Sequence, residues 1–199
     1  MSSYLKKLAV PVEVANDNQR EEAFRKKAAE LITIKDIPAL SRLKLSHSRQ
    51  LAGMSNSNYR RTVVNALKNL RGRQLKDVPA ENILITCAKE GWYKKGNVDV
   101  AGPFASGSKL FQGANWVAKI TRGTNKYAHC SHLIYLYDQH MNPLVARWLE
   151  DNSRAFDDAY ALTELIQWVW RSRVRNGQPI TLYLPSQRMR QLMEEWLSD

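Results

Sequence analysis

Residues 82–87 read Asn-Ile-Leu-Ile-Thr-Cys, a short apolar run typical of a strand that is buried on both faces of a sheet. Three later stretches have the same character, at residues 116–120, 132–138 and 179–185. Segments with helical spacing of apolar residues separate and follow these runs, so strands are expected to alternate with helices. The sequence therefore predicts an α/β fold with a parallel sheet of about four strands over residues 77–199.

The part of the chain before these strands has helical periodicity instead. Asn18 and Glu21 form a capping-box pattern at the start of a helix expected over about residues 19–33. A second helix, with its apolar residues on one side, is expected to end at Gly72, where a C-terminal cap belongs. We therefore expect a basic, helical N-terminal segment at residues 1–76, followed by the α/β part.

Two long helices are expected in the α/β part. Asp157 or Asp158 can cap a helix that ends near Arg175, and Ser186 can cap the last helix of the chain. The basic end of the first of these helices, from Arg171 onward, also has a purely structural explanation. Cations there stabilise the helix dipole without any ligand.

Composition excludes several classes of protein. The chain has 199 residues, of which 44% are hydrophobic, so it can bury a core without disulfides or a metal. Its two cysteines, Cys87 and Cys130, cannot form a disulfide scaffold or a cysteine-rich zinc site, and we expect no metal site. No signal peptide and no membrane-spanning apolar run are recognisable, so we expect a cytoplasmic protein without membrane contact.

Charge is the first property that points to a partner. The chain has 30 basic and 19 acidic residues, a net charge of +11. Residues 35–76 hold ten of the cations and one acid, Asp36. Such a density favours DNA, RNA or another polyanion, and the alternative is a solvated basic surface with no ligand. The expected electrostatic surface on the second helix consists of Arg60, Arg61, Lys68 and Arg71.

A second pattern in this basic region has a different meaning. Residues 53–59 read Gly-Met-Ser-Asn-Ser-Asn-Tyr, and this stretch resembles the turn of a helix-turn-helix. The small residue usual four positions before the glycine is replaced by Arg49. A helix-turn-helix regulator that binds DNA is therefore one alternative function.

The order of motifs in the α/β part resembles the second RecA-like lobe of a superfamily 2 helicase. The resemblance covers residues 80–185. The strand at 82–87 takes the place of the early strand near motif IV, and Leu-Phe-Gln-Gly at 110–113 resembles the F-x-x-G that precedes motif V. Thr-Arg-Gly-Thr-Asn at 121–125 resembles the motif V loop, and a strand that ends in Asp138 follows.

Motif VI of that family has its counterpart in the helix expected from Tyr160 onward. Its core in the family is Gln-x-x-Gly-Arg with a second arginine after it. Gln167 and Arg171 keep the first spacing, and Arg173 and Arg175 bracket the place of the second arginine. The resemblance implies that these four residues face an ATP site, where arginines stabilise the charge that develops during phosphoryl transfer.

The same resemblance implies further roles. Thr121, Gly123 and Thr124 would contact the nucleic-acid backbone. The chain has no phosphate-binding loop and no Asp-Glu pair for magnesium. It is therefore not expected to hydrolyse ATP alone, and ATP with Mg²⁺ is expected only with a partner protein that carries the first lobe. The implied function is a helicase-like lobe that acts in DNA replication or recombination.

Two other features leave alternatives open. The stretch Trp92-Tyr93-Lys94-Lys95 mixes aromatic rings with cations, which suits stacking on single-stranded bases, although such rings can equally cover a hydrophobic edge. A function from another class is also compatible with the charge. The chain would then be a non-catalytic interaction protein that docks an acidic protein or blocks a helicase.

Overall fold

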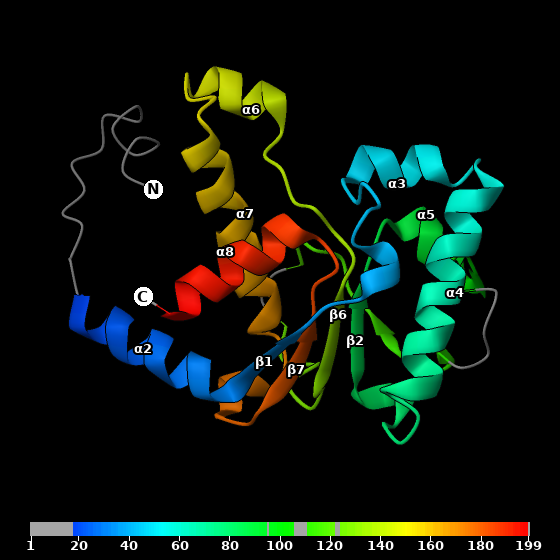
Figure 1. Cartoon of the computed structure of the whole chain (residues 1–199), viewed down its shortest axis with the longest axis horizontal. Coiled ribbons are helices and arrows are strands. Elements are labelled where there is room, and N and C mark those ends of the chain that lie inside the picture. Colours follow the sequence, from blue (N-terminus) through cyan, green and yellow to red (C-terminus); the bar gives the residue numbers. More distant parts are fainter. Residues whose placement is uncertain (1–17, 95, 106–110, 122–123, 199) are drawn as a thin grey trace.

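A single parallel sheet organises the molecule (Figure 1). The computed structural model describes residues 18–94, 96–105, 111–121 and 124–198. The five strands lie in the order β1-β7-β6-β2-β5, and every neighbouring pair is parallel. The α/β class expected from the sequence is confirmed. The strands are β1 (Ile32–Lys35), β2 (Ile83–Thr86), β5 (Asn115–Trp116), β6 (His132–Tyr135) and β7 (Ile180–Tyr183).

All four expected strands have a counterpart, although β5 shares only Trp116 with the stretch expected at 116–120, and β1 is a further strand that sequence patterning did not predict. β1 has only four residues, Ile-Thr-Ile-Lys, and it follows a helix directly, so no periodicity separates the two. It pairs with β7, with Ile32 opposite Ile180. Residues on both sides of the boundary expected at residue 76 therefore contribute to one sheet, and the helical character expected of residues 1–76 is interrupted by a strand.

Helices follow most of the strands, and one small β-hairpin follows the short helix at Lys89–Trp92. The helices are α2 (Asn18–Leu31), α3 (His47–Gly53), α4 (Ser57–Arg73), α5 (Lys89–Trp92), α6 (Pro143–Trp148), α7 (Arg154–Val169) and α8 (Gln187–Ser198). The hairpin consists of β3 (Tyr93–Lys94) and β4 (Asn97–Ala101), which pair antiparallel.

The helix expected to end near Arg175 ends at Val169, because the extended backbone of Ser172 interrupts it, and Arg173–Asn176 form a separate 3-10 helix. The helix caps differ from the expected ones at two further places. Ser153 caps α7 by accepting from the backbone N–H of Phe156, and it lies four and five residues before the two aspartates expected to do so. This frees Asp157 and Asp158 for other contacts. At the other place, α4 continues through Gly72 and ends with Gln74 as its cap.

The sheet is covered on both faces, as a buried parallel sheet requires. Alternation along β2 directs Leu84 toward α2, α7 and α8, and directs Ile83 and Ile85 toward α4. Figure 1 shows α4 on the opposite side of the sheet from α7 and α8. The face of α4 that points away from the sheet is therefore on the outside of the molecule.

The turn between α3 and α4 depends on one close approach. A Cβ added at Gly53 would lie 2.4 Å from Cδ1 of Tyr59, whose hydroxyl donates to the backbone oxygen of Lys44. We expect Gly53→Ala to lower the free energy of unfolding by about 1–3 kcal/mol, because the held ring must move.

Gly72→Ala provides a matched control within the next helix. A Cβ there meets nothing within 4 Å, and alanine is the better helix former, so we expect this variant to gain about 0.5–1 kcal/mol. Urea unfolding of both variants measures whether Gly53→Ala lowers the free energy of unfolding while Gly72→Ala raises it. A neutral Gly53→Ala would show that the α3–α4 turn accommodates a side chain.

Candidate functional site

A groove of about 860 Å³ runs beside the first half of α4. Its walls come from α3, α4, α5 and the hairpin, and it contains three of the cations expected to contact nucleic acid, Arg60, Arg61 and Lys94. Glu90 is the one acid among its described lining residues. Arg61 and Lys94 are far apart in the sequence, so the fold itself brings them to one surface.

The electrostatics of α4 add to this concentration of positive charge. The side chain of Asn56 caps the helix by accepting from the backbone N–H of Tyr59 at 3.0 Å. The 17 residues of the helix include no Asp or Glu, although carboxylates favour the first turn because of the helix dipole. Arg60 and Arg61 stand near that positive end instead, which costs helix stability unless an anion is bound.

The other expected nucleic-acid residues are more scattered. Lys68 is exposed on α4, whereas Arg71 donates to the backbone oxygen of Leu75. Thr121 is half-buried, and the hydroxyl of Thr124 accepts from the backbone N–H of Lys126. Lys95 and Gly123 lie outside the described residues.

Trp92 belongs to the core and not to the surface. Its side chain is 5% exposed and packs edge-on against Phe111, with 6.0 Å between ring centroids. An indole in this position covers a hydrophobic edge and is not accessible to a base, which corrects its assignment as a stacking residue.

The four residues expected at an ATP site lie at the amino edge of the sheet, because α7 runs back from the carboxyl edge toward the start of β7. Gln167 is exposed, whereas Arg171 is 6% exposed and donates to the backbone oxygen of Gln167 at 2.9 Å. Arg173 donates to the backbone oxygen of Pro179 at 2.6 Å. Arg175 donates to the side-chain oxygen of Asn125, so the two segments that resemble motifs V and VI do touch.

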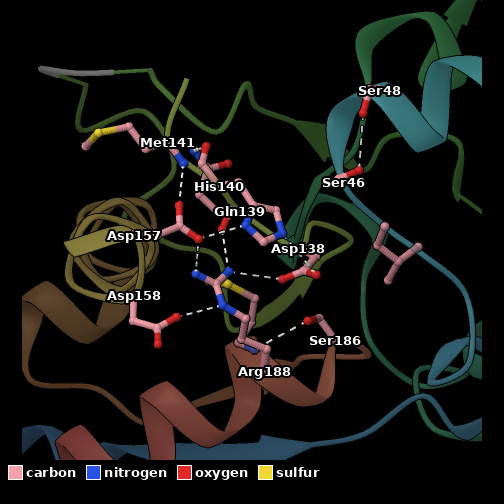
Figure 2. Close-up of polar contacts among 12 residues, drawn as sticks. Ser46, Ser48, Asp138, Gln139, His140, Met141, Asp157, Asp158, Ser186 and Arg188 are labelled. Carbon is pink, nitrogen blue, oxygen red and sulfur yellow. Dashed lines mark hydrogen bonds and ion pairs between the residues drawn. The ribbon is translucent and has the colours of Figure 1, made fainter. Parts of the chain in front are cut away.

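A cluster that the sequence did not predict occupies the carboxyl edge of the sheet (Figure 2). Arg188, in the first turn of α8, bonds three carboxylates: Asp138 at 3.2 Å, Asp157 at 2.7 Å and Asp158 at 2.7 Å. His140 lies between two of them, with Nδ1 2.8 Å from Asp157 and Nε2 3.3 Å from Asp138. The cluster connects the end of β6 to α7 and α8, so its evident role is to hold these elements together.

Asp157 makes the stability of this cluster depend on pH. Burial raises the pKa of its carboxyl group, but the backbone N–H of Met141, the side chain of His140 and the charge of Arg188 together outweigh burial and lower the pKa. A carboxyl with a lowered pKa stabilises the fold above its ordinary pKa of 3.8, and this stabilisation is lost as the pH falls through the folded-state value.

We expect Arg188→Ala to cost roughly 1–2 kcal/mol of unfolding free energy at neutral pH, since the ion pairs are partly exposed. The deficit should shrink in acid, as the pH falls through the lowered folded-state pKa of Asp157, because its carboxylate then no longer pairs with Arg188. Urea midpoints at the two pH values check this, with Arg188→Met as the control that keeps the apolar stem. An equal deficit at both pH values would assign the effect to packing and not to charge.

The described part of the chain gives less support to a metal site, a cysteine nucleophile or a membrane-spanning helix. No group of three His, Cys, Asp or Glu side chains there is placed to hold a metal ion. Burial raises the pKa of both thiols, that of Cys130 to about 11, so neither is prepared as a nucleophile. None of the described helices combines the length and apolar character needed to cross a bilayer.

Comparison with known proteins identifies the family. The model of a family described as the YonV C-terminal Rossmann-like domain matches residues 26–197, most of the chain. The chain belongs to the family of YonV C-terminal Rossmann-like domains. This membership agrees with the parallel sheet and with the coarser part of the expected resemblance, a Rossmann-like α/β fold. It does not single out a helicase lobe.

One curated protein is similar in sequence to part of this chain. It is 40% identical over 79 residues and is described as the SPbeta prophage-derived uncharacterized protein YonV of Bacillus subtilis (strain 168). The aligned segment covers 39% of this chain and 19% of the relative. No solved structure matches the chain.

Proposed function

We propose that this chain binds nucleic acid, with the groove beside α4 as its phosphate-binding surface. The proposal rests on one observation: Arg60, Arg61 and Lys94 line the same groove. The helix that carries the two arginines, α4, has 17 residues and no Asp or Glu. Arginine forks bond phosphate oxygens in pairs, and a lysine adds a point charge. An anion at this place also offsets the unfavourable position of two arginines near the positive end of α4.

Such contacts read the shape and charge of a nucleic acid and carry little sequence information by themselves. The relative described as prophage-derived adds a biological setting, because a phage genome must be copied and recombined. We therefore propose a role in DNA replication or recombination.

A second candidate function rests on one contact. Arg175 is exposed and bonds Asn125, which joins the segments that resemble motifs V and VI of a helicase. In this candidate, the chain completes an ATP site with a partner lobe, and Arg175 is better placed than the buried Arg171 to reach a phosphate. A fluorescent ATP analogue with Mg²⁺ and the partner lobe tests it. Arg175→Ala should abolish the binding that the partner confers, and unchanged binding would exclude this role.

The test of nucleic-acid binding is fluorescence anisotropy of labelled DNA at two salt concentrations. If the three groove cations neutralise about three phosphates, affinity should fall about 40-fold between about 50 mM and about 200 mM salt. Absence of binding at the lower concentration would overturn the proposal. The basic groove would then serve an acidic protein partner, which a pull-down with acidic proteins would identify.

A further inference from the structure

The outer face of α4 carries a row of polar side chains beyond the groove. Residues spaced by three or four positions share one face of a helix. On α4 the exposed members of this face are Asn58, Arg61, Asn65, Lys68, Asn69 and Gly72. The row is continuous with the groove, because Arg61 and Asn65 also line it.

The amides in this row have no evident structural task. Asparagine is a poor residue for a helix interior, because its side chain competes for backbone hydrogen bonds. Asn58 accepts from the guanidinium of Arg61 at 3.0 Å, but no hydrogen bond joins the side chains of Asn65 and Asn69 to other described residues. Two unengaged amides therefore face outward between cations.

Gly72 extends the same face without a side chain. The space around its Cα is open, since an added Cβ would meet nothing within 4 Å. Packing therefore does not require a glycine at this position, whereas a close approach by another molecule would benefit from one. From Asn58 to Gly72 the row is about 21 Å long, a length that corresponds to about six base pairs of a duplex.

The row and the groove fit a duplex better than a single strand. Proteins that bind single strands combine a cationic track with aromatic rings on which bases stack. Among the described residues that line the cationic groove, none is aromatic. A separate cavity of about 410 Å³ is lined by Trp92, Tyr93 and Phe111, but its described lining includes Asp99 and no lysine or arginine. Rings and cations thus lie in different cavities.

We infer, on the basis of the proposed function, that the ligand is duplex DNA and that α4 lies in its major groove. Asn65 and Asn69 face base edges, where an amide can pair with adenine, and Arg60, Arg61 and Lys94 hold the flanking phosphates. The B-form major groove is about 12 Å wide and admits a helix, whereas the major groove of duplex RNA is too narrow for side chains to read. The ligand class is therefore double-stranded DNA.

The experiment compares three labelled ligands of one sequence with the whole chain: a short DNA duplex, one of its strands and the matching RNA duplex. We expect the DNA duplex to bind at least about tenfold more tightly than the other two. The variant Asn65→Ala with Asn69→Ala should lose at least about tenfold in duplex affinity with an unchanged salt slope, because no charge is removed. Gln191→Ala, which removes an exposed amide from α8, is the matched control and should bind normally.

The outcomes separate this inference from the proposal on which it rests. Equal or tighter binding of the single strand or of duplex RNA would overturn the duplex inference and leave nucleic-acid binding intact. The same holds if the double asparagine variant binds the duplex like the unaltered chain, because α4 would then not face the bases. Absence of binding to all three ligands would overturn the proposed function itself.

Discussion

Arg60→Glu combined with Arg61→Glu is expected to weaken DNA binding at least about 100-fold at low salt. Each substitution removes a charge-assisted contact to phosphate, worth about 1.5–3 kcal/mol, and adds repulsion. The fold should persist, because glutamates near the start of α4 suit the helix dipole better than arginines do. Anisotropy with labelled duplex DNA measures the loss, and circular dichroism verifies the helix content.

The control for this variant changes net charge by the same amount elsewhere. Lys26→Glu with Lys27→Glu reverses two adjacent exposed cations on α2, which packs on the other face of the sheet. Binding should then fall only by the long-range effect of net charge, a few-fold at low salt. Equal losses in both variants would mean that overall charge, and not the groove beside α4, attracts DNA.

Gln50→Ala is expected to lower the free energy of unfolding by about 3 kcal/mol, the largest effect on stability among the variants considered. The Gln50 side chain is 1% exposed and makes three hydrogen bonds. It donates to the backbone oxygens of Leu45 at 2.9 Å and Leu136 at 2.6 Å, and it accepts from the backbone N–H of Ala88 at 2.9 Å. Alanine removes the partner of the Leu136 oxygen and of the Ala88 N–H, whereas the Leu45 oxygen keeps a bond from the backbone N–H of Asp138 at 3.2 Å.

Urea unfolding measures this loss. Gln50→Glu is the sharper second variant, because it keeps the shape and the accepted bond but loses both donated bonds. Gln191→Ala, an exposed amide on α8, should change stability by less than about 0.5 kcal/mol. A loss below about 1 kcal/mol in Gln50→Ala would show that water or a shifted α3 replaces the three bonds.

Gln50 also explains why the proposed function lies away from the sheet edge. In open α/β sheets, ligands bind outside the carboxyl ends of the strands where the strand order reverses. Here the chain leaves β2 toward β5 and leaves β6 toward β7, so the reversal lies between β2 and β6. The Gln50 side chain, carried by α3, bonds the backbone just after both strands. Gln50 thus occupies the place where β2 and β6 end, and we regard the exposed basic surface beside α4 as the stronger candidate.

Local patterns in the sequence were sufficient for the α/β class, for four strands and for most helices. Apolar periodicity reflects which side of an element is buried, and each element carries that information within its own few residues. The sequence alone also predicts that α4 is positively charged, because five cations and no acid lie within its 17 consecutive residues. The strand β1 was missed because four residues after a helix are too few to show a period.

Tertiary structure alone decided which residues meet. The groove depends on Lys94 lying beside Arg60 and Arg61. Arg188 of α8 meets Asp138, which follows β6, and Asp157 and Asp158 of α7. The two aspartates of α7 looked like helix caps, because a cap is the one role that neighbouring sequence can suggest for them. Burial of Trp92 and Arg171 likewise followed from packing between distant segments. Contacts of this kind depend on strand order and on long loop closures, which no local period encodes.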